Sequence, residues 1–316
     1  MKLTLAAIVF AGIAGTACAQ QYPTHMVRLV VPFPAGSATD QVGRVLGQQL
    51  QDFLGQPFVV DNKPGALASI GTAEVAKSTP DGYTIALTTN TTHAANVALF
   101  KNLPYDPVKN FAPIVRVTTV PMVLVVRPDF PAQSMKEFID YARAKSGALT
   151  AGYFSSGSQV SIAKLKTVGR FSTVDVPYKG SPATISDIIG GHISFSIVDL
   201  TVALPQVQGG KLKGLGVTAL KRSPFAPELP ALAESFPGFE MILWHGLAAP
   251  AGTPRDIVNK LYDAVAKSVD KAQTRTRLAS LHLDVDLLNP DQFSDYIRRE
   301  IAKWTKETKE AGIEPE

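Results

Sequence analysis

Two turns of small residues are the segments of this sequence best suited to chemistry. The first reads PAGSATD over residues 34–40 and the second SSGSQVS over residues 155–161, and each joins an apolar, strand-like run to a helical pattern. The first amide N–H groups of a helix have no intrahelical partner and lie at the positive end of the helix dipole. Because small side chains let an anion reach these donors, each turn predicts a backbone anion site.

A structural interpretation of the same residues stays open beside the chemical one. Ser37, Thr39 and Ser158 are also suited to ordinary helix capping, and Asp40 would complement the helix dipole. Asp40 would repel an anion if it pointed into a cleft, so we expect it to cap or hold its turn. Two such turns facing one cleft could hold a carboxylate without arginine, and this pairing favours the binding interpretation.

The common local sequence signatures of catalysis and metal binding are absent. The sequence contains no G-x-S-x-G elbow, no H-E-x-x-H, no Walker loop and no G-x-G-x-x-G after a strand. The histidines lie too far apart for a local metal motif, and no pattern indicates a site assembled from distant residues. The sequence therefore predicts a protein that is not an enzyme and has no cofactor or bound metal. The five histidines are His25, His93, His192, His245 and His282.

Strands and helices alternate along most of the chain, which is typical of an α/β protein with parallel pairing and right-handed crossovers. A second set of strand–helix units follows a β-rich run over residues 117–126 that Pro121 interrupts. Two extended runs, residues 122–127 and 241–249, frame this set, and there the chain would leave one domain and return to it. The tail from Thr253 onward is predicted to be helical. The first set consists of strands at 27–31, 58–60 and 83–88 and helices at 42–54 and 68–76.

The N-terminus predicts export. Lys2 precedes an apolar stretch that ends before Ala17-Cys18-Ala19, which is typical of a signal peptide over residues 1–19 and too short for a membrane span. Cleavage would remove Cys18, the only cysteine, and so exclude a disulfide scaffold or a thiol enzyme. An alternative makes Cys18 a lipid anchor, although Gly15 stands where such signals usually have a large aliphatic residue. We expect a periplasmic protein.

Composition excludes further classes. The 316 residues are 45% hydrophobic and 18% charged, enough for a substantial core and about two domains. Lys plus Arg number 31 against 27 Asp plus Glu, and the resulting charge of +4 is scattered singly. A nucleic-acid binder would concentrate this charge on one face, so we expect no nucleic-acid partner.

Seven segments carry a resemblance to a known family. The chain resembles the periplasmic solute receptors of tripartite tricarboxylate transporters, also called Bug receptors, and the segments run in family order through nearly the whole mature chain. The segments are VPFPAGSATD from Val31, QPFVVDNKPGALASIGTAEVAKSTPDGYT from Gln56, LPYDPVKNFAPI from Leu103, VPYKG from Val176, GGKLKGLGVTALKRSP from Gly209, LAAPAGTP from Leu247 and AGIEPE from Ala311.

This resemblance implies a two-domain periplasmic-binding-protein fold of class α/β, each domain a largely parallel sheet flanked by helices. Residues 20–123 and 247–316 would form domain 1 and residues 124–246 domain 2, joined by two hinge strands. The ligand carboxylate would lie between the two turns, a loop at residues 90–93 and residues near Asp199. The implied ligand-binding residues are Phe33, Ala35, Gly36, Ser37, Ala38, Asp40, Asn90, Thr91, Thr92, His93, Ser155, Ser156, Gly157, Ser158, Gln159, Val160, Ser161, Lys179, Asp199 and Leu200.

Departures from the family pattern bear on the ligand. Ser37 replaces a common second glycine, and Leu200 stands where the family commonly has asparagine. Val160, Ile162 and Leu200 could form an apolar wall of the cleft, which would favour acids with an apolar or aromatic body. The helical spacing of Ile162 equally allows Val160 and Ile162 to point into the core.

The function predicted on these grounds is a monomeric receptor that binds a small aromatic or aliphatic carboxylate and delivers it to the membrane subunits of a tripartite tricarboxylate transporter. The alternatives are an exported α/β hydrolase and a carboxylate-sensing signalling receptor. A hydrolase would need a nucleophile with a base in reach, for which the sequence offers no local motif.

Overall fold

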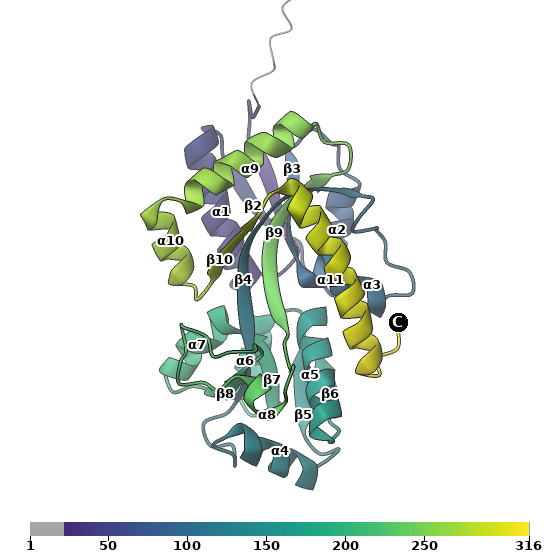
Figure 1. Ribbon diagram of the computed structural model, residues 1–316, viewed down its shortest axis with the longest axis vertical. Coiled ribbons are helices and arrows are strands. Elements are labelled where there is room, and N and C mark those ends of the chain that lie inside the picture. The colour runs from purple at the N-terminus through teal and green to yellow at the C-terminus, as the bar shows by residue number, and fades with distance from the viewer. Residues whose placement is uncertain (1–21, 316) are drawn as a thin grey trace, which may run out of the picture.

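The computed structural model describes residues 22–315, which form two lobes stacked along the long axis (Figure 1). The predicted signal peptide and Cys18 lie outside the described residues. The strands are β1 (Val27–Val31), β2 (Phe58–Asn62), β3 (Thr84–Thr89), β4 (Phe111–Val126), β5 (Thr150–Tyr153), β6 (Val174–Pro177), β7 (Phe195–Asp199), β8 (Lys213–Val217), β9 (Ile242–Pro250) and β10 (Asp284–Leu288). The helices are α1 (Ala38–Leu54), α2 (Ser69–Ala76), the π-helix η1 (Thr91–Ala95), α3 (Asn96–Leu99), α4 (Met135–Ala144), α5 (Ser156–Gly169), α6 (Ser181–Ile189), α7 (Leu200–Gln208), α8 (Leu232–Ser235), α9 (Arg255–Val269), α10 (Ala272–Ala279) and α11 (Pro290–Glu310).

Each lobe has a parallel group of strands completed by antiparallel partners. In the first lobe β1 pairs in parallel with β2 and β3, and in the second β5 pairs in parallel with β6 and β7. Strand β9 runs antiparallel to β3 and β4, while β4 runs antiparallel to β7 and β8. The predicted α/β class and two-domain fold are confirmed, with a sheet that is mixed where the lobes meet.

Strand β4 belongs to both lobes. It pairs with β9 as far as Pro121 and with β7 from Met122 onward, so its hydrogen-bonding partner changes at these two residues (Figure 1). Our prediction that Pro121 interrupts the strand is wrong, because the ladder continues through it as a strand of 16 residues. The Thr218 side chain bridges the two chain segments near this change of partner. Its hydroxyl donates to the Met241 carbonyl at 2.7 Å and accepts from the Met122 amide at 2.9 Å. The domain boundaries at 123/124 and 246/247 stay a prediction.

Two segments differ in type from the sequence prediction. The tail is not helical throughout, because β10 pairs antiparallel with β4 between α10 and α11. Leu283 is buried and Val285 and Leu287 partly buried, which is the alternation of a strand with one covered face. Residues 90–93 do not form a loop, because β3 runs directly into η1.

Helix α11 lies alongside both lobes, as Figure 1 shows. Near the first lobe, Glu300 accepts hydrogen bonds from the indole N–H groups of Trp244 on β9, at 3.1 Å, and Trp304, at 3.0 Å. Toward the second lobe, the Glu307 carboxylate pairs with Lys164 on α5 at 2.8 Å. No helix in the described range 22–315 is both long and apolar enough to cross a membrane.

Candidate functional site

Two adjoining cavities lie between the lobes. The inner chamber has a volume of about 20 Å³, room for about one water molecule, and the outer chamber about 530 Å³. Phe33 and Phe154 line both, so the chambers share a wall. The other residues of the inner chamber are Ser37, Thr39, Thr89, Asn90, Thr91, Ser155, Asp199, Leu243 and His245.

The first turn is held rigid by Asp40. Its Oδ2 accepts from the Gly36 amide at 2.9 Å and from Arg44 Nε at 3.0 Å, and its Oδ1 accepts from Asn62 at 3.0 Å. Burial alone would raise the pKa of Asp40, but the hydrogen bonds from Arg44, Gly36 and Asn62 outweigh burial and hold this pKa below its usual range. Asp40 therefore holds the turn, as its charge suggested, and its carboxylate is fully engaged away from the inner chamber.

The second turn is a reciprocal helix cap. Ser155 Oγ accepts from the Ser158 amide at 3.2 Å, and Ser158 Oγ accepts from the Ser155 and Phe154 amides at 3.2 and 3.0 Å. Ser161 Oγ donates to the Gly157 carbonyl at 2.7 Å. The hydroxyls of Ser155, Ser158 and Ser161 therefore cap and order the backbone of this turn. Capping is compatible with anion binding, because it leaves the role of anion donor to the backbone amides.

Fewer backbone amides are free to bind an anion than the sequence of the two turns predicted. At the first turn the Gly36 and Ser37 amides are consumed by Asp40 and by the Pro34 carbonyl, and at the second the Gln159 amide is bonded to the Ser155 carbonyl. Among the first amides of α1 and α5, those without a protein acceptor are the amides of Ala38 and Thr39 in α1 and of Ser156 and Gly157 in α5. One pair of free donors comes from each lobe.

None of the titratable side chains around the inner chamber is cationic near pH 7. Burial lowers the pKa of His245 to about 4 and that of His93 to about 3, so both are neutral near pH 7. Burial raises the pKa of Asp199 to about 6. Asn90 Nδ2 is buried without an acceptor. Any anion in this chamber would therefore be held by neutral donors.

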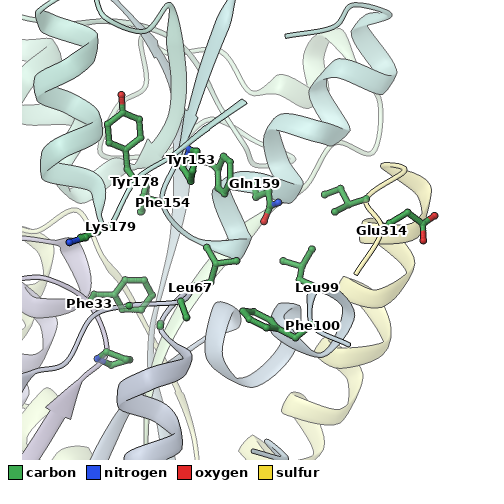
Figure 2. A pocket seen from close by; sticks show the side chains of 16 residues that line it. Phe33, Leu67, Leu99, Phe100, Tyr153, Phe154, Gln159, Tyr178, Lys179 and Glu314 are labelled. Carbon is green, nitrogen blue, oxygen red and sulfur yellow. The ribbon is translucent and has the colours of Figure 1, made fainter. Parts of the chain in front are cut away.

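The outer chamber is mainly apolar and aromatic. Figure 2 shows Phe33, Leu67, Leu99 and Phe100 on one side, and Tyr153, Phe154, Gln159 and Tyr178 opposite them. Lys179 and Glu314 are the charged side chains of its lining. The cavity can therefore take an apolar body larger than the inner chamber admits.

The residues proposed as an apolar wall do not line either chamber. Val160, Ile162 and Leu200 are at most 1% exposed and belong to the main hydrophobic core. Val160 and Ile162 are buried on different faces of α5, and Leu200 is buried at the start of α7. The open alternative, that Val160 and Ile162 point into the core, is the correct one.

The other sequence candidates divide between the chambers and their supports. Ser37, Asn90, Thr91, Ser155 and Asp199 line the inner chamber and Gln159 and Lys179 the outer one, while Phe33 lines both. Thr92 and His93 are buried behind the inner chamber, where the Thr92 hydroxyl binds Thr89 and His93 packs on Phe111. Ala35 and Gly36 are exposed outside both cavities.

Sequence reasoning missed most of the outer chamber. Its floor includes Ala66, Leu67 and Ala68, which have positive φ angles of 43°, 48° and 67°. Three consecutive left-handed non-glycine residues are rare and are typical of functional loops, but no sequence pattern reports them. Ile313 and Glu314, from the AGIEPE ending, also line this chamber.

Several contacts cross between the lobes at the site. Ser156 Oγ on α5 donates a short hydrogen bond to Asn96 Oδ1 on α3 across the cleft, and within the first lobe Asn96 Nδ2 donates to the Leu67 carbonyl at 2.9 Å. Gly157 lies so near Asn90 that a Cβ atom would stand 2.8 Å from the amide nitrogen. The lobes are therefore in contact around the inner chamber. Within residues 22–315 no cluster of three His, Cys, Asp or Glu could hold a metal ion.

Comparison with known proteins identifies the family. The model of the tripartite tricarboxylate transporter family receptor matches residues 42–313. Protein BugT of Bordetella pertussis is 32% identical over 311 residues, 96% of this chain and 95% of BugT. A solved R. palustris protein with adipate is 34% identical with a TM-score of 0.91, over 93% of this chain and all of that one. MatC from Rhodopseudomonas palustris with bound malate is 32% identical with a TM-score of 0.85, over 90% and 99%. The chain therefore belongs to the receptor family of the tripartite tricarboxylate transporters, a family of periplasmic binding proteins and not of enzymes.

Proposed function

We propose that this receptor binds a small organic acid with its carboxylate at the inner chamber and its apolar body in the outer chamber. The observation that carries the proposal is that the starts of α1 and α5, which contribute Ser37, Thr39 and Ser155 to the lining of the inner chamber, each have two free amides. Neutral donors at helix N-termini are suited to a carboxylate, because they stabilise its charge without a counterion. The receptor then delivers the acid to the membrane subunits of a tripartite tricarboxylate transporter.

Aliphatic or aromatic acids of moderate size suit this site best. The adipate and malate of the two solved relatives support a carboxylate ligand. The side chains of Phe33, Phe100, Tyr153 and Tyr178 in the outer chamber favour a ligand that buries apolar surface, at about 25 cal/mol for each Å². A second polar group that found no partner there would cost about 1–3 kcal/mol.

A thermal-shift screen followed by calorimetry tests this function. We expect benzoate or adipate to raise the Tm of the mature chain and to bind more tightly than malate or citrate, because the outer chamber is mainly apolar. An acid at 100 times its Kd adds about 2.7 kcal/mol to apparent stability. If no carboxylate shifted the Tm, the proposed function would be wrong, and a preference for citrate would contradict the apolar-body assignment.

Export and domain closure complete the proposal. Residues 1–19 act as a signal peptide that places the mature chain in the periplasm as a monomer. Residues 20–123 and 247–316 form one domain and 124–246 the other, and they close on the ligand by rotation about the β4 and β9 crossovers. The change of strand partner at Pro121 and Met122 supports a hinge at this level.

The hydrogen bond between Ser156 and Asn96 should stabilise the closed form. Ser156→Ala removes the donor and leaves a buried amide oxygen without its partner, so we expect acid affinity to fall roughly tenfold. Calorimetry measures the loss, and X-ray scattering should show a larger radius of gyration for the liganded variant than for the liganded native chain. Ser161→Ala is the matched control, because the Ser161 hydroxyl bonds within α5 and does not cross the cleft. Equal affinities of the two variants would argue against a role in closure.

A further inference from the structure

Asp199 is the one carboxylate that lines the inner chamber. It stands at the end of β7, is 7% exposed, and makes no ion pair in the described chain. The one hydrogen bond that lowers the pKa of Asp199 against the effect of burial comes from its own backbone amide. The Asp199 side chain does not cap α7. A carboxylate so placed shares the chamber with Thr39 of α1 and with Ser155, the cap of α5, beside the two helix starts whose free amides would attract an anion, and no cation offsets its charge.

The elements packed around Asp199 supply no positive charge to the chamber. Strand β9 contributes His245, whose Nδ1 lies 3.1 Å from the Thr118 hydroxyl, and η1 contributes His93 behind the chamber wall. Burial holds the pKa of both imidazoles well below 7, so both are neutral. The chamber residues of α1, α5 and β3 are uncharged, as is Met122 opposite Asp199 on β4. Lys179 lines only the outer chamber.

An acid bound at these amides would bring a second carboxylate into the same small volume. Two carboxylates at hydrogen-bond distance cannot both stay ionised without a cation, and such a pair holds one proton between them. Burial already raises the pKa of Asp199 to about 6, so the folded chain needs little further driving force to take up this proton.

We propose that the receptor binds each acid molecule together with one proton, which Asp199 holds as the hydrogen-bond donor to the ligand carboxylate. This inference rests on the proposed function and adds its proton balance: the ligand carboxylate, one solvent proton and ionised Asp199 become a neutral carboxyl paired with the bound carboxylate. Through Asp199 the affinity for the acid would then fall as the solution becomes alkaline. A ligand hydroxyl donating to ionised Asp199 is the rival arrangement, and it would take up no proton.

Calorimetry with adipate tests the proposal. For the native chain we expect the Kd to rise nearly tenfold for each pH unit between pH 7 and 8.5, and titrations at pH 8 in two buffers of different ionisation enthalpy to show about one proton taken up per adipate. Asp199→Asn is isosteric and cannot hold the proton, so its uptake should be close to zero and its pH profile flat. Asp263→Asn, on the exposed surface of α9, should behave as the native chain.

Each outcome decides between the two proposals. A flat profile in the native chain, or binding of malate with no proton uptake, overturns the shared proton while leaving a carboxylate receptor. Equal uptake in native and Asp199→Asn chains assigns the proton to another group and likewise overturns it. If adipate, malate and benzoate all fail to bind the native chain at every pH, the proposed function itself fails, and the proton proposal falls with it. The native profile decides even if the variant does not fold.

Discussion

Gly157→Val should abolish acid binding while the protein stays folded. A Cβ atom at position 157 would stand 2.8 Å from Asn90 Nδ2 and 3.0 Å from the Leu243 side chain, and both of these residues line the inner chamber. The branched side chain would hold the lobes apart and block access to the free amides of Ser156 and Gly157. Because hydrogen bonds to a charged group contribute about 1.5–3 kcal/mol each, we expect affinity to fall by roughly 100-fold or more.

Calorimetry and a melting curve measure this effect, with Gly157→Ala as a smaller step in the same direction. Thr167→Val, near the other end of α5, is the matched control for a β-branched apolar residue in this helix. Native-like affinity in Gly157→Val would show that the α5 turn does not hold the acid. The corresponding change at Gly36 is less informative, since Gly36 has a φ of 81° and its amide is already bonded to Asp40.

Acidification should destabilise the fold through two buried histidines. Their folded pKa values, about 3 for His93 and about 4 for His245, lie below the ordinary 6.5, because burial penalises the charged imidazolium. Below about pH 6.5 both histidines bind protons in the unfolded chain but stay neutral in the folded chain. The full stability is therefore present above pH 6.5 and is lost as the pH falls toward 4, at ~1.4 kcal/mol per pH unit for each histidine.

Asp199 acts in the opposite direction over part of this range. Its folded pKa of about 6 exceeds the ordinary 3.8, so the folded chain gains ~3 kcal/mol as the pH falls from 6 to 4. The histidines together lose roughly twice as much, and the net loss should be ~3 kcal/mol. Melting curves from pH 7.5 to 4 measure it. His93→Phe should flatten the curve and exposed His192→Phe should not; a native Tm independent of pH would contradict the assignment.

The backbone part of the site could be predicted because it depends on local rules. Ser37 was predicted as a helix cap from its residue type and position, and it is the N-cap of α1. At the second turn we predicted Ser158, whereas Ser155 is the N-cap of α5 and Ser158 is its reciprocal partner. Sequence could not say which amides stay free. That depends on Asp40 reaching back to Gly36 and on Asn62 reaching from β2, contacts that tertiary packing decides.

The residues that line the outer chamber could not be predicted from local sequence patterns. Leu67, Phe100, Tyr178 and Ile313 come from four distant segments that only the folded lobes bring together. Leu200 illustrates the converse error, since its place in the family pattern suggested the cleft but its side chain is packed in the core. Apolar residues give the same sequence signal whether they line a cavity or fill a core.

The hydrogen bonds of Glu300 hold the two tryptophans of the chain together beside the proposed hinge. The chain has only two tryptophans, and both indole N–H groups share this one buried carboxylate, Trp244 from the crossing strand β9 and Trp304 from α11. All of its tryptophan emission therefore originates beside this one carboxylate. If the proposed closure shifts β9 against α11, the polarity around both indole rings changes, and intrinsic fluorescence in stopped-flow mixing would follow it without a dye or an engineered label.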